Sequence, residues 1–122
     1  MLRIRAGKSV YLALAAVLGA AAPIGAAHAA SFDCDKAAAS DEIAICAHRS
    51  LDDADVEMAT RYTMQLQLLP MGGAGALRDD QKAWLGWRRA CGGDVTCLTN
   101  AYADRISALK AAFDAIAARG PF

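Results

Sequence analysis

The sequence predicts an all-α protein, a small disulfide-stabilised bundle of about four helices that follows a cleaved signal peptide. Between residues 41 and 118, apolar residues recur three and four positions apart, which is the period of an amphipathic helix. No stretch alternates apolar and polar residues as a strand does. Four cysteines in a chain of 122 residues supply covalent bridges for a core that is small for its surface.

The start of the chain, residues 1–29, has the features of a secretory signal peptide. Three basic residues lie between positions 3 and 8, residues 10–22 form an apolar run, and AHA at 27–29 matches the small-x-small cleavage pattern. We therefore predict cleavage after Ala29. An uncleaved anchor is disfavoured because the run is shorter than the roughly 20 residues that span a membrane. A lipoprotein is disfavoured because the residues before Cys34 do not form a lipobox.

Cleavage changes the charge of the chain. The sequence has thirteen basic and thirteen acidic residues, and residues 1–29 contain three of the basic ones and none of the acidic ones. The mature chain, residues 30–122, then has ten basic and thirteen acidic residues, a net charge of about −3. A mildly acidic domain lacks the basic surface that nucleic acid or anionic lipid requires. We expect a protein partner of basic character, no nucleic acid, and no membrane anchor after cleavage.

All four cysteines lie in the exported part. An even number of cysteines in a short exported domain favours two disulfides. Of the three possible pairings, proximity in the sequence favours Cys34 with Cys46 and Cys91 with Cys97. A structural zinc site is the competing use of four cysteines, but these spacings differ from the C-x2-C pattern and the compartment is oxidising. We expect no metal and no cofactor.

The first two helices are predicted from their caps and apolar spacing. Residues 41–47 form a short helix with Ser40 as its N-cap, and residues 51–69 form a helix of about five turns that starts at a cap on Ser50. Pro70 ends the second helix because proline cannot continue it.

The last two helices form a hairpin. Residues 71–75, MGGAG, read as a flexible linker, followed by a helix at about 76–90 and another at about 94–118. Gly92 stands where a helix ends in the left-handed conformation, and Asp94 stands where an N-cap starts the next helix. A disulfide across this turn closes the hairpin.

No group of residues has the composition of a reaction centre. His48 is the one histidine in the mature chain, and we interpret it as a surface or helix-capping residue. Without a second histidine, and with every thiol in a disulfide, neither a Ser-His-Asp nor a Cys-His arrangement is available. We predict no catalytic residue and no enzymatic activity.

Four acidic residues lie close together near the start of the second helix. Calcium loops need ligands at alternating loop positions, and glycoside hydrolysis needs two carboxylates across a cleft, whereas side chains on a helix fan around its axis. We interpret the group as a solvated helix start. Its members are the first candidates for contact with a partner: Asp52, Asp53, Asp55 and Glu57.

An aromatic and basic cluster, of a kind enriched at binding hot spots, lies on the third helix. Our preferred interpretation is core packing by Trp84 and Trp87 on one broad face, with the Arg88 guanidinium over the Trp84 ring. The exposed side of Trp87, together with Arg89, supplies the second set of binding candidates.

Motifs over nearly the whole mature chain resemble a known family. They are SFDCDKA at 31–37, DEIAIC at 41–46, LDDAD at 51–55, Tyr62, QKAWLGWRRAC at 81–91 and CLTNAYADRI at 97–106. In these motifs the chain is similar to the LprI-like lysozyme-inhibitor family of small exported bacterial domains. The combination of two short-range cysteine pairs with Trp84, Tyr102 and Arg105 is specific for that domain.

The resemblance implies a helical, disulfide-stabilised domain over residues 30–122 and, for at least one family member, inhibition of lysozyme. This chain departs from the family's lipoprotein member in its missing lipobox, in having no added C-terminal domain and in its connector. The expected location is therefore periplasmic or secreted, without tethering. No inhibitory residue is carried over from the family.

Two alternative functions are considered. The first is an exported protein-binding module that inhibits lysozyme-type muramidases by steric blockage of the active cleft, helped by attraction between its acidic surface and a basic enzyme. The second is a structural or interaction domain of the envelope that binds another protein without affecting lysozyme.

Overall fold

The computed structural model describes residues 29–120. The helices in chain order are η1 (Cys34–Lys36), α1 (Ser40–Ala47), α2 (Arg49–Leu68), α3 (Met71–Ala90) and α4 (Val95–Ala117). The predicted all-α class is confirmed, because no strand occurs in this described range. Almost all of the predicted signal peptide, residues 1–28, lies outside it, and its cleavage stays a prediction.

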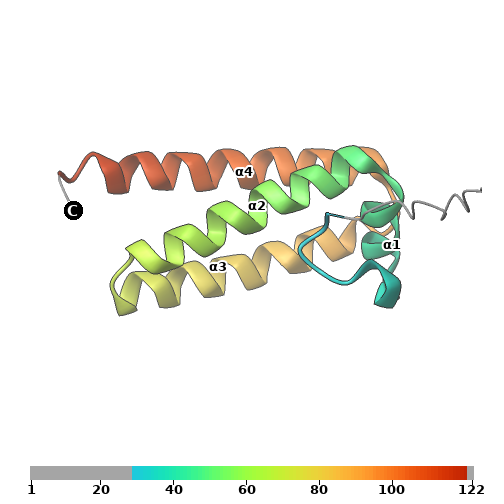
Figure 1. Ribbon diagram of the computed structural model, residues 1–122, viewed down its shortest axis with the longest axis horizontal. Coiled ribbons are helices and arrows are strands. Elements are labelled where there is room, and N and C mark those ends of the chain that lie inside the picture. Colours follow the sequence, from blue (N-terminus) through green and yellow to red (C-terminus); the bar gives the residue numbers. More distant parts are fainter. Residues whose placement is uncertain (1–28, 121–122) are drawn as a thin grey trace, which may run out of the picture.

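Three long helices run side by side, and α1 lies across one end of them (Figure 1). α2 and α3 form one antiparallel hairpin, and α3 and α4 form a second, so α2 and α4 are parallel. The N-terminal segment and η1 lie at the same end as α1, whereas α4 ends at the opposite end, near the turn between α2 and α3. The turn between α3 and α4 lies beside α1.

The hydrophobic core contains side chains from all four helices. Its largest members are fully or almost fully buried: Ile45 of α1, Leu51 and Met58 of α2, Trp84 of α3, and Leu98, Tyr102 and Leu109 of α4. Burial of each such side chain contributes about 1.5–3 kcal/mol. The buried side chains of α2 and α4 recur at helical spacing, in agreement with the apolar period in the sequence.

Both predicted disulfides are present. Cys34 pairs with Cys46 and joins η1 to α1, and Cys91 pairs with Cys97 and joins the end of α3 to the first turn of α4. In the chain-entropy account, closing such short loops stabilises a domain by about 2–3 kcal/mol each. Both bridges lie at the end of the bundle where α1 crosses it.

The predicted turn between α3 and α4 is also confirmed. Gly92 has a φ of 56°, in the left-handed region where a Cβ is unfavourable. Asp94 is the N-cap of α4, and its carboxylate accepts a hydrogen bond of 2.9 Å from the amide of Cys97. The local residues therefore specify both the end of one helix and the start of the next.

The predicted linker at residues 71–75 is wrong. α3 begins at Met71, and the amide of Ala74 donates to the carbonyl of Pro70 over 2.9 Å. Three glycines in a helix cost about 1 kcal/mol each relative to alanine. Ala74, which lies among these glycines, is 5% exposed, so the first turn of α3 packs against the rest of the protein.

The junction between α1 and α2 is shorter than predicted. His48 alone separates the two helices, and neither Ser40 nor Ser50 is an N-cap. The ring Nδ1 of His48 donates a hydrogen bond of 2.8 Å to the carbonyl of Ala44. The backbone carbonyl of His48 accepts from the amides of the next helix at 2.9 and 3.0 Å. The prediction that His48 caps a helix end is therefore confirmed.

Candidate functional site

The structure separates the acidic candidates of α2 into an exposed pair and a buried pair. Asp53 and Glu57 are exposed. Each is paired with an arginine on its own helix, Asp53 with Arg49 at 3.6 Å and Glu57 with Arg61 at 2.7 Å. Pairs of this kind contribute about 0.3–0.5 kcal/mol. Since each carboxylate already has a cation beside it, little negative charge on this face remains for a partner.

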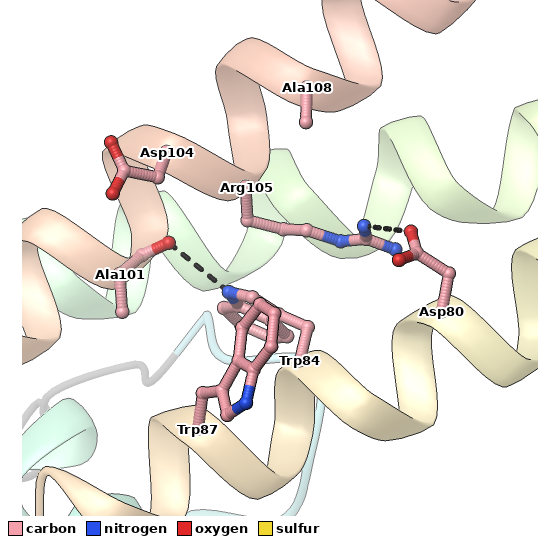
Figure 2. Close-up of a pocket in the computed structure, with 7 residues that line it drawn as sticks. All are labelled: Asp80, Trp84, Trp87, Ala101, Asp104, Arg105 and Ala108. Atoms are coloured by element: carbon pink, nitrogen blue, oxygen red, sulfur yellow. Dashed lines mark hydrogen bonds and ion pairs between the residues drawn. The ribbon is translucent and has the colours of Figure 1, made fainter.

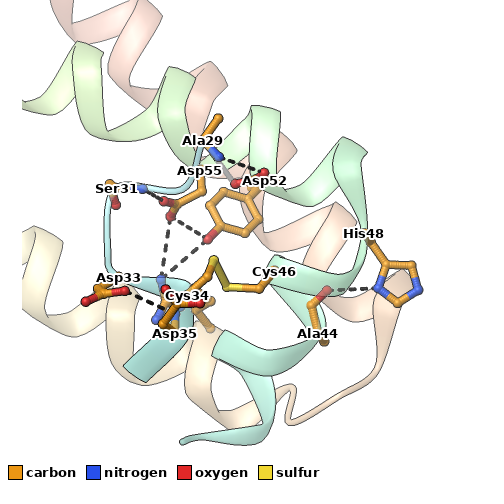
Figure 3. The surroundings of a disulfide bond; sticks show 12 residues. Ala29, Ser31, Asp33, Cys34, Asp35, Ala44, Cys46, His48, Asp52 and Asp55 are labelled. Atoms are coloured by element: carbon orange, nitrogen blue, oxygen red, sulfur yellow. Dashed lines mark hydrogen bonds and ion pairs between the residues drawn. A yellow bond between two sulfur atoms is a disulfide. The ribbon is translucent and has the colours of Figure 1, made fainter. Parts of the chain in front are cut away.

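The other two acidic candidates are inside the protein. Asp52 is 6% exposed and Asp55 is 0% exposed, so the expected solvated face is wrong for both. Three positions apart on a helix, they point to the same side. That side faces the N-terminal segment: Ala29 donates its amide hydrogen to Asp52 over 3.0 Å, and Ser31 donates to Asp55 over 2.7 Å (Figure 3).

A buried polar network connects α1, α2, α3 and α4. Arg88 donates from Nε to Asp41 over 3.0 Å, and its Nη1 lies 3.6 Å from Asp55 Oδ1. The hydroxyl of Tyr102 donates to the same oxygen over 2.7 Å. Burial, with a further contribution from Asp55, raises the pKa of Tyr102 well above its ordinary value, which keeps the hydroxyl protonated as a donor. The network has a structural role, because all four side chains are buried.

The tryptophans of α3 have different environments. Trp84 is 4% exposed, packs edge-on against Tyr102 with ring centroids 5.2 Å apart, and donates from Nε1 to the carbonyl of Ala101 over 3.1 Å. Arg88 lies over the Trp84 ring at 6.0 Å, as predicted, and over Phe32 at 5.6 Å.

Core packing was the wrong prediction for Trp87, which is 71% exposed. A separation of three positions places it about 60° around α3 from Trp84. The face of α3 that meets the core is too narrow to include both rings. Arg89 is exposed as well. A role of either residue in binding stays a prediction.

A pocket of about 300 Å³ opens between α3 and α4 beside Trp87 (Figure 2). Its walls are the two indole rings and small apolar side chains, with carboxylates from both helices. The lining residues are Asp80, Trp84, Trp87, Ala101, Asp104, Arg105 and Ala108. Arg89 is outside this set.

Arg105 is held in place by side chains of α3. Its Nε and Nη2 donate to Gln81 Oε1 over 3.0 and 2.8 Å, and its Nη1 donates to Asp80. Gln81 in turn donates to the sulfur of Met58 on α2 over 3.1 Å. The guanidinium is 5% exposed and already satisfied, so it stiffens the wall of the pocket.

Sequence reasoning missed the pocket because its residues are separated by the turn between α3 and α4. One signal was available. Trp87 lies four positions before Cys91, and Ala101 lies four positions after Cys97. The disulfide therefore brings the two residues to the same level of the antiparallel hairpin, and the other lining positions follow at helical spacing.

A family model described as Lysozyme inhibitor LprI matches residues 34–109, which is more than half of the chain. The chain belongs to the LprI family. Comparisons with curated proteins and with solved structures gave no match. The resemblance found in the sequence motifs is thus confirmed for the family.

The segment that matches LprI coincides with the parts of the structure described above. It begins at the first cysteine, contains both disulfides and the Arg88 network, and includes every residue that lines the pocket. Within residues 29–120, none of the LprI helices has the length and apolar character needed to span a membrane. The same range has no cluster of three or more His, Cys, Asp or Glu side chains arranged to hold a metal ion.

Proposed function

We propose that residues 30–122 are an exported, periplasmic or secreted binding module that inhibits a lysozyme-type muramidase by covering the enzyme's active cleft. The module acts by binding and not by catalysis. Membership of the LprI family supports inhibition as the type of function. The observation that carries the proposal is the exposed Trp87 at the mouth of the pocket between α3 and α4.

The pocket has properties of a binding hot spot. Tryptophan is enriched at such positions because it brings a large apolar surface at a small loss of conformational freedom. The neighbouring Cys91–Cys97 disulfide and the buried Arg105 hold both helices in place. A rigid surface has less conformational entropy to lose on association. Trp87 is therefore a stronger candidate contact than the acidic face of α2.

The charges beside Trp87 suit a basic partner. Asp80 and Asp104 lie on either side of the two indole rings (Figure 2). Asp80 is paired with Arg105, while Asp104 makes no ion pair with another residue of the described range. A lysine or arginine of the partner can lie against the indole face of Trp87 with its charge near Asp104. The net charge of about −3 of residues 30–122 favours encounter with a basic enzyme.

Inhibition of cell-wall lysis tests the proposal. The disulfide-bonded mature chain is mixed in excess with a basic muramidase, and loss of turbidity of a cell-wall suspension is measured. We expect inhibition by the native chain and a loss of at least about tenfold in potency for Trp87→Ala. Met71→Ala is the matched control, because Met71 is an apolar residue of the same helix, 93% exposed, at its opposite end. Undiminished lysis in the presence of the native chain would dispose of the proposal.

A second apolar surface favours the alternative of an envelope interaction domain. Met64 of α2 and Phe113 of α4 are exposed and line a smaller pocket of about 100 Å³ with Arg61 and Gln65. If this surface carries the function, Phe113→Ala abolishes binding to an envelope protein, while Trp87→Ala does not, and lysozyme stays active.

A further inference from the structure

The buried charges near the start of α2 are unbalanced. Asp41, Asp52 and Asp55 are all buried, and Arg88 is the buried cation that contacts two of them. Asp52 makes no ion pair with any residue of the described range, and its Oδ1 is buried without a hydrogen-bond partner. A buried carboxylate without a cation is costly, because it loses its hydration and gains no opposite charge in return.

The polar contact that Asp52 does have comes from the point at which we predict cleavage. Its Oδ2 accepts from the amide of Ala29 over 3.0 Å. Two residues later, the amide of Ser31 donates to Asp55 Oδ2 over 2.7 Å (Figure 3). Ala30 lies between these two contacts and packs against the hydrophobic core. The backbone nitrogen of Ala30 therefore lies between the amides of Ala29 and Ser31, which donate to two buried carboxylates.

We propose that the α-ammonium group created at Ala30 by signal cleavage forms an ion pair with the buried carboxylate of Asp52. A signal peptidase hydrolyses the Ala29–Ala30 peptide bond with one water molecule. The water oxygen becomes part of the carboxylate of Ala29, which leaves with the signal peptide, and both protons of the water go to the nitrogen of Ala30, which becomes an ammonium group. The donor at Asp52 thereby changes from a neutral amide to a cation.

The exchange improves the environment of Asp52 in two ways. An ammonium group has three N–H donors, whereas the amide of Ala29 has one, so Oδ1 also gains a donor. The new positive charge also compensates the negative charge of Asp52, which Arg88 does not contact. Ala30 has to advance by up to one residue spacing of about 3.8 Å to take over the position of Ala29. Removal of the preceding chain leaves the core contact of Ala30 and the Ser31–Asp55 hydrogen bond as the contacts that have to adjust.

As a consequence, the free energy of unfolding is larger for the processed chain than for the same domain with residues still attached before Ala30. Asp55 links this corner to Tyr102 and Arg88, so anchoring of the N-terminus supports the contacts between α2, α3 and α4. The proposal rests on the predicted cleavage site and is independent of the proposed inhibition.

Thermal unfolding of two chains that differ at the N-terminus, each with and without the Asp52→Asn substitution, tests the ion pair. The first chain is the protein processed in its native compartment, and the second carries Gly-Ser before Ala30, which keeps an ammonium group but moves it by two residues. We expect the extension to lower the unfolding midpoint by about 5 °C. In the Asp52→Asn variant, we expect the extension to leave the unfolding midpoint unchanged, because the carboxylate that pairs with the ammonium group is absent. In the control Asp53→Asn, which changes the exposed neighbouring carboxylate, the full effect of the extension remains.

A second measurement needs no substitution. The α-amine of the processed chain is acetylated in the folded and in the urea-unfolded state, and mass spectrometry gives the rate at the N-terminal residue. We expect acetylation to be at least tenfold slower in the folded chain. Equal rates, equal unfolding midpoints of the two chains, or a mature chain that begins elsewhere than Ala30 would each overturn the proposal.

Discussion

Tyr102 on α4 donates a hydrogen bond of 2.7 Å from its hydroxyl to Asp55 on α2. Arg88 of α3 lies 3.6 Å from the same carboxylate oxygen, and Ser31 donates to the other oxygen. One buried carboxylate therefore joins three helices and the N-terminal segment. Substitutions around it measure how much this network stabilises the fold.

Asp55→Ala is expected to lower the free energy of unfolding by about 3 kcal/mol, because it leaves a buried guanidinium with one carboxylate fewer and a buried hydroxyl without its acceptor. Urea unfolding followed by circular dichroism measures the change. Asp53→Ala, two positions earlier on the exposed face, is the control, with an expected effect within about 0.5 kcal/mol. Equal effects of the two substitutions would contradict a stabilising role for the network.

The raised pKa of Tyr102 predicts that the stability of the fold decreases at alkaline pH. Its pKa is raised in the folded protein, by burial first and by Asp55 second, so the folded chain keeps a proton that the unfolded chain releases near pH 10. The unfolded state then binds fewer protons, and stability falls as the pH rises above about 10. Urea midpoints between pH 8 and 11 should show this fall. Tyr102→Phe should make it shallower; an unchanged slope would show that other groups cause it.

Removal of the Cys91–Cys97 bridge by a double change to serine is expected to cost about 2 kcal/mol, since the bridge closes a loop of only six residues. The bridge also holds the corner next to the Trp87 pocket, so we expect weaker inhibition at temperatures where the variant is folded. The same change at Cys34 and Cys46, away from the pocket, should lower the unfolding midpoint and leave inhibition intact. Similar losses of inhibition in both variants would argue against the pocket.

Two glycines of the α3–α4 hairpin should respond to alanine in opposite directions. Gly92→Ala is expected to destabilise by about 1–2 kcal/mol, because the φ of 56° brings a Cβ close to the following carbonyl. Gly86→Ala is expected to stabilise by about 1 kcal/mol, because Gly86 lies inside α3 with open space around its Cβ position. Differential scanning calorimetry of both variants measures the two signs. Changes of the same sign would contradict the backbone argument.

The helices and the turn between α3 and α4 could be predicted because their signals are local. The left-handed Gly92 and the capping Asp94 act within a few residues, and the two disulfides join cysteines that are close in the sequence. The candidate site could be predicted only in part. Trp87 was named as a binding candidate, but its pocket also needs Asp104 and Arg105 from the other side of the turn.

The sequence by itself determined the helical class, the turn after Cys91, the disulfide pairing and the resemblance to LprI, because periodicity, caps and motifs are properties of neighbouring residues. Tertiary structure alone decided three other features. It placed Trp87 outside the core, buried Asp52 and Asp55, and extended α3 through the glycines at 72, 73 and 75. The physical reason is that burial depends on which surfaces meet. Asp55, for example, accepts hydrogen bonds from Ser31 of the N-terminal segment and from Tyr102 of α4, both more than 20 positions away in the sequence.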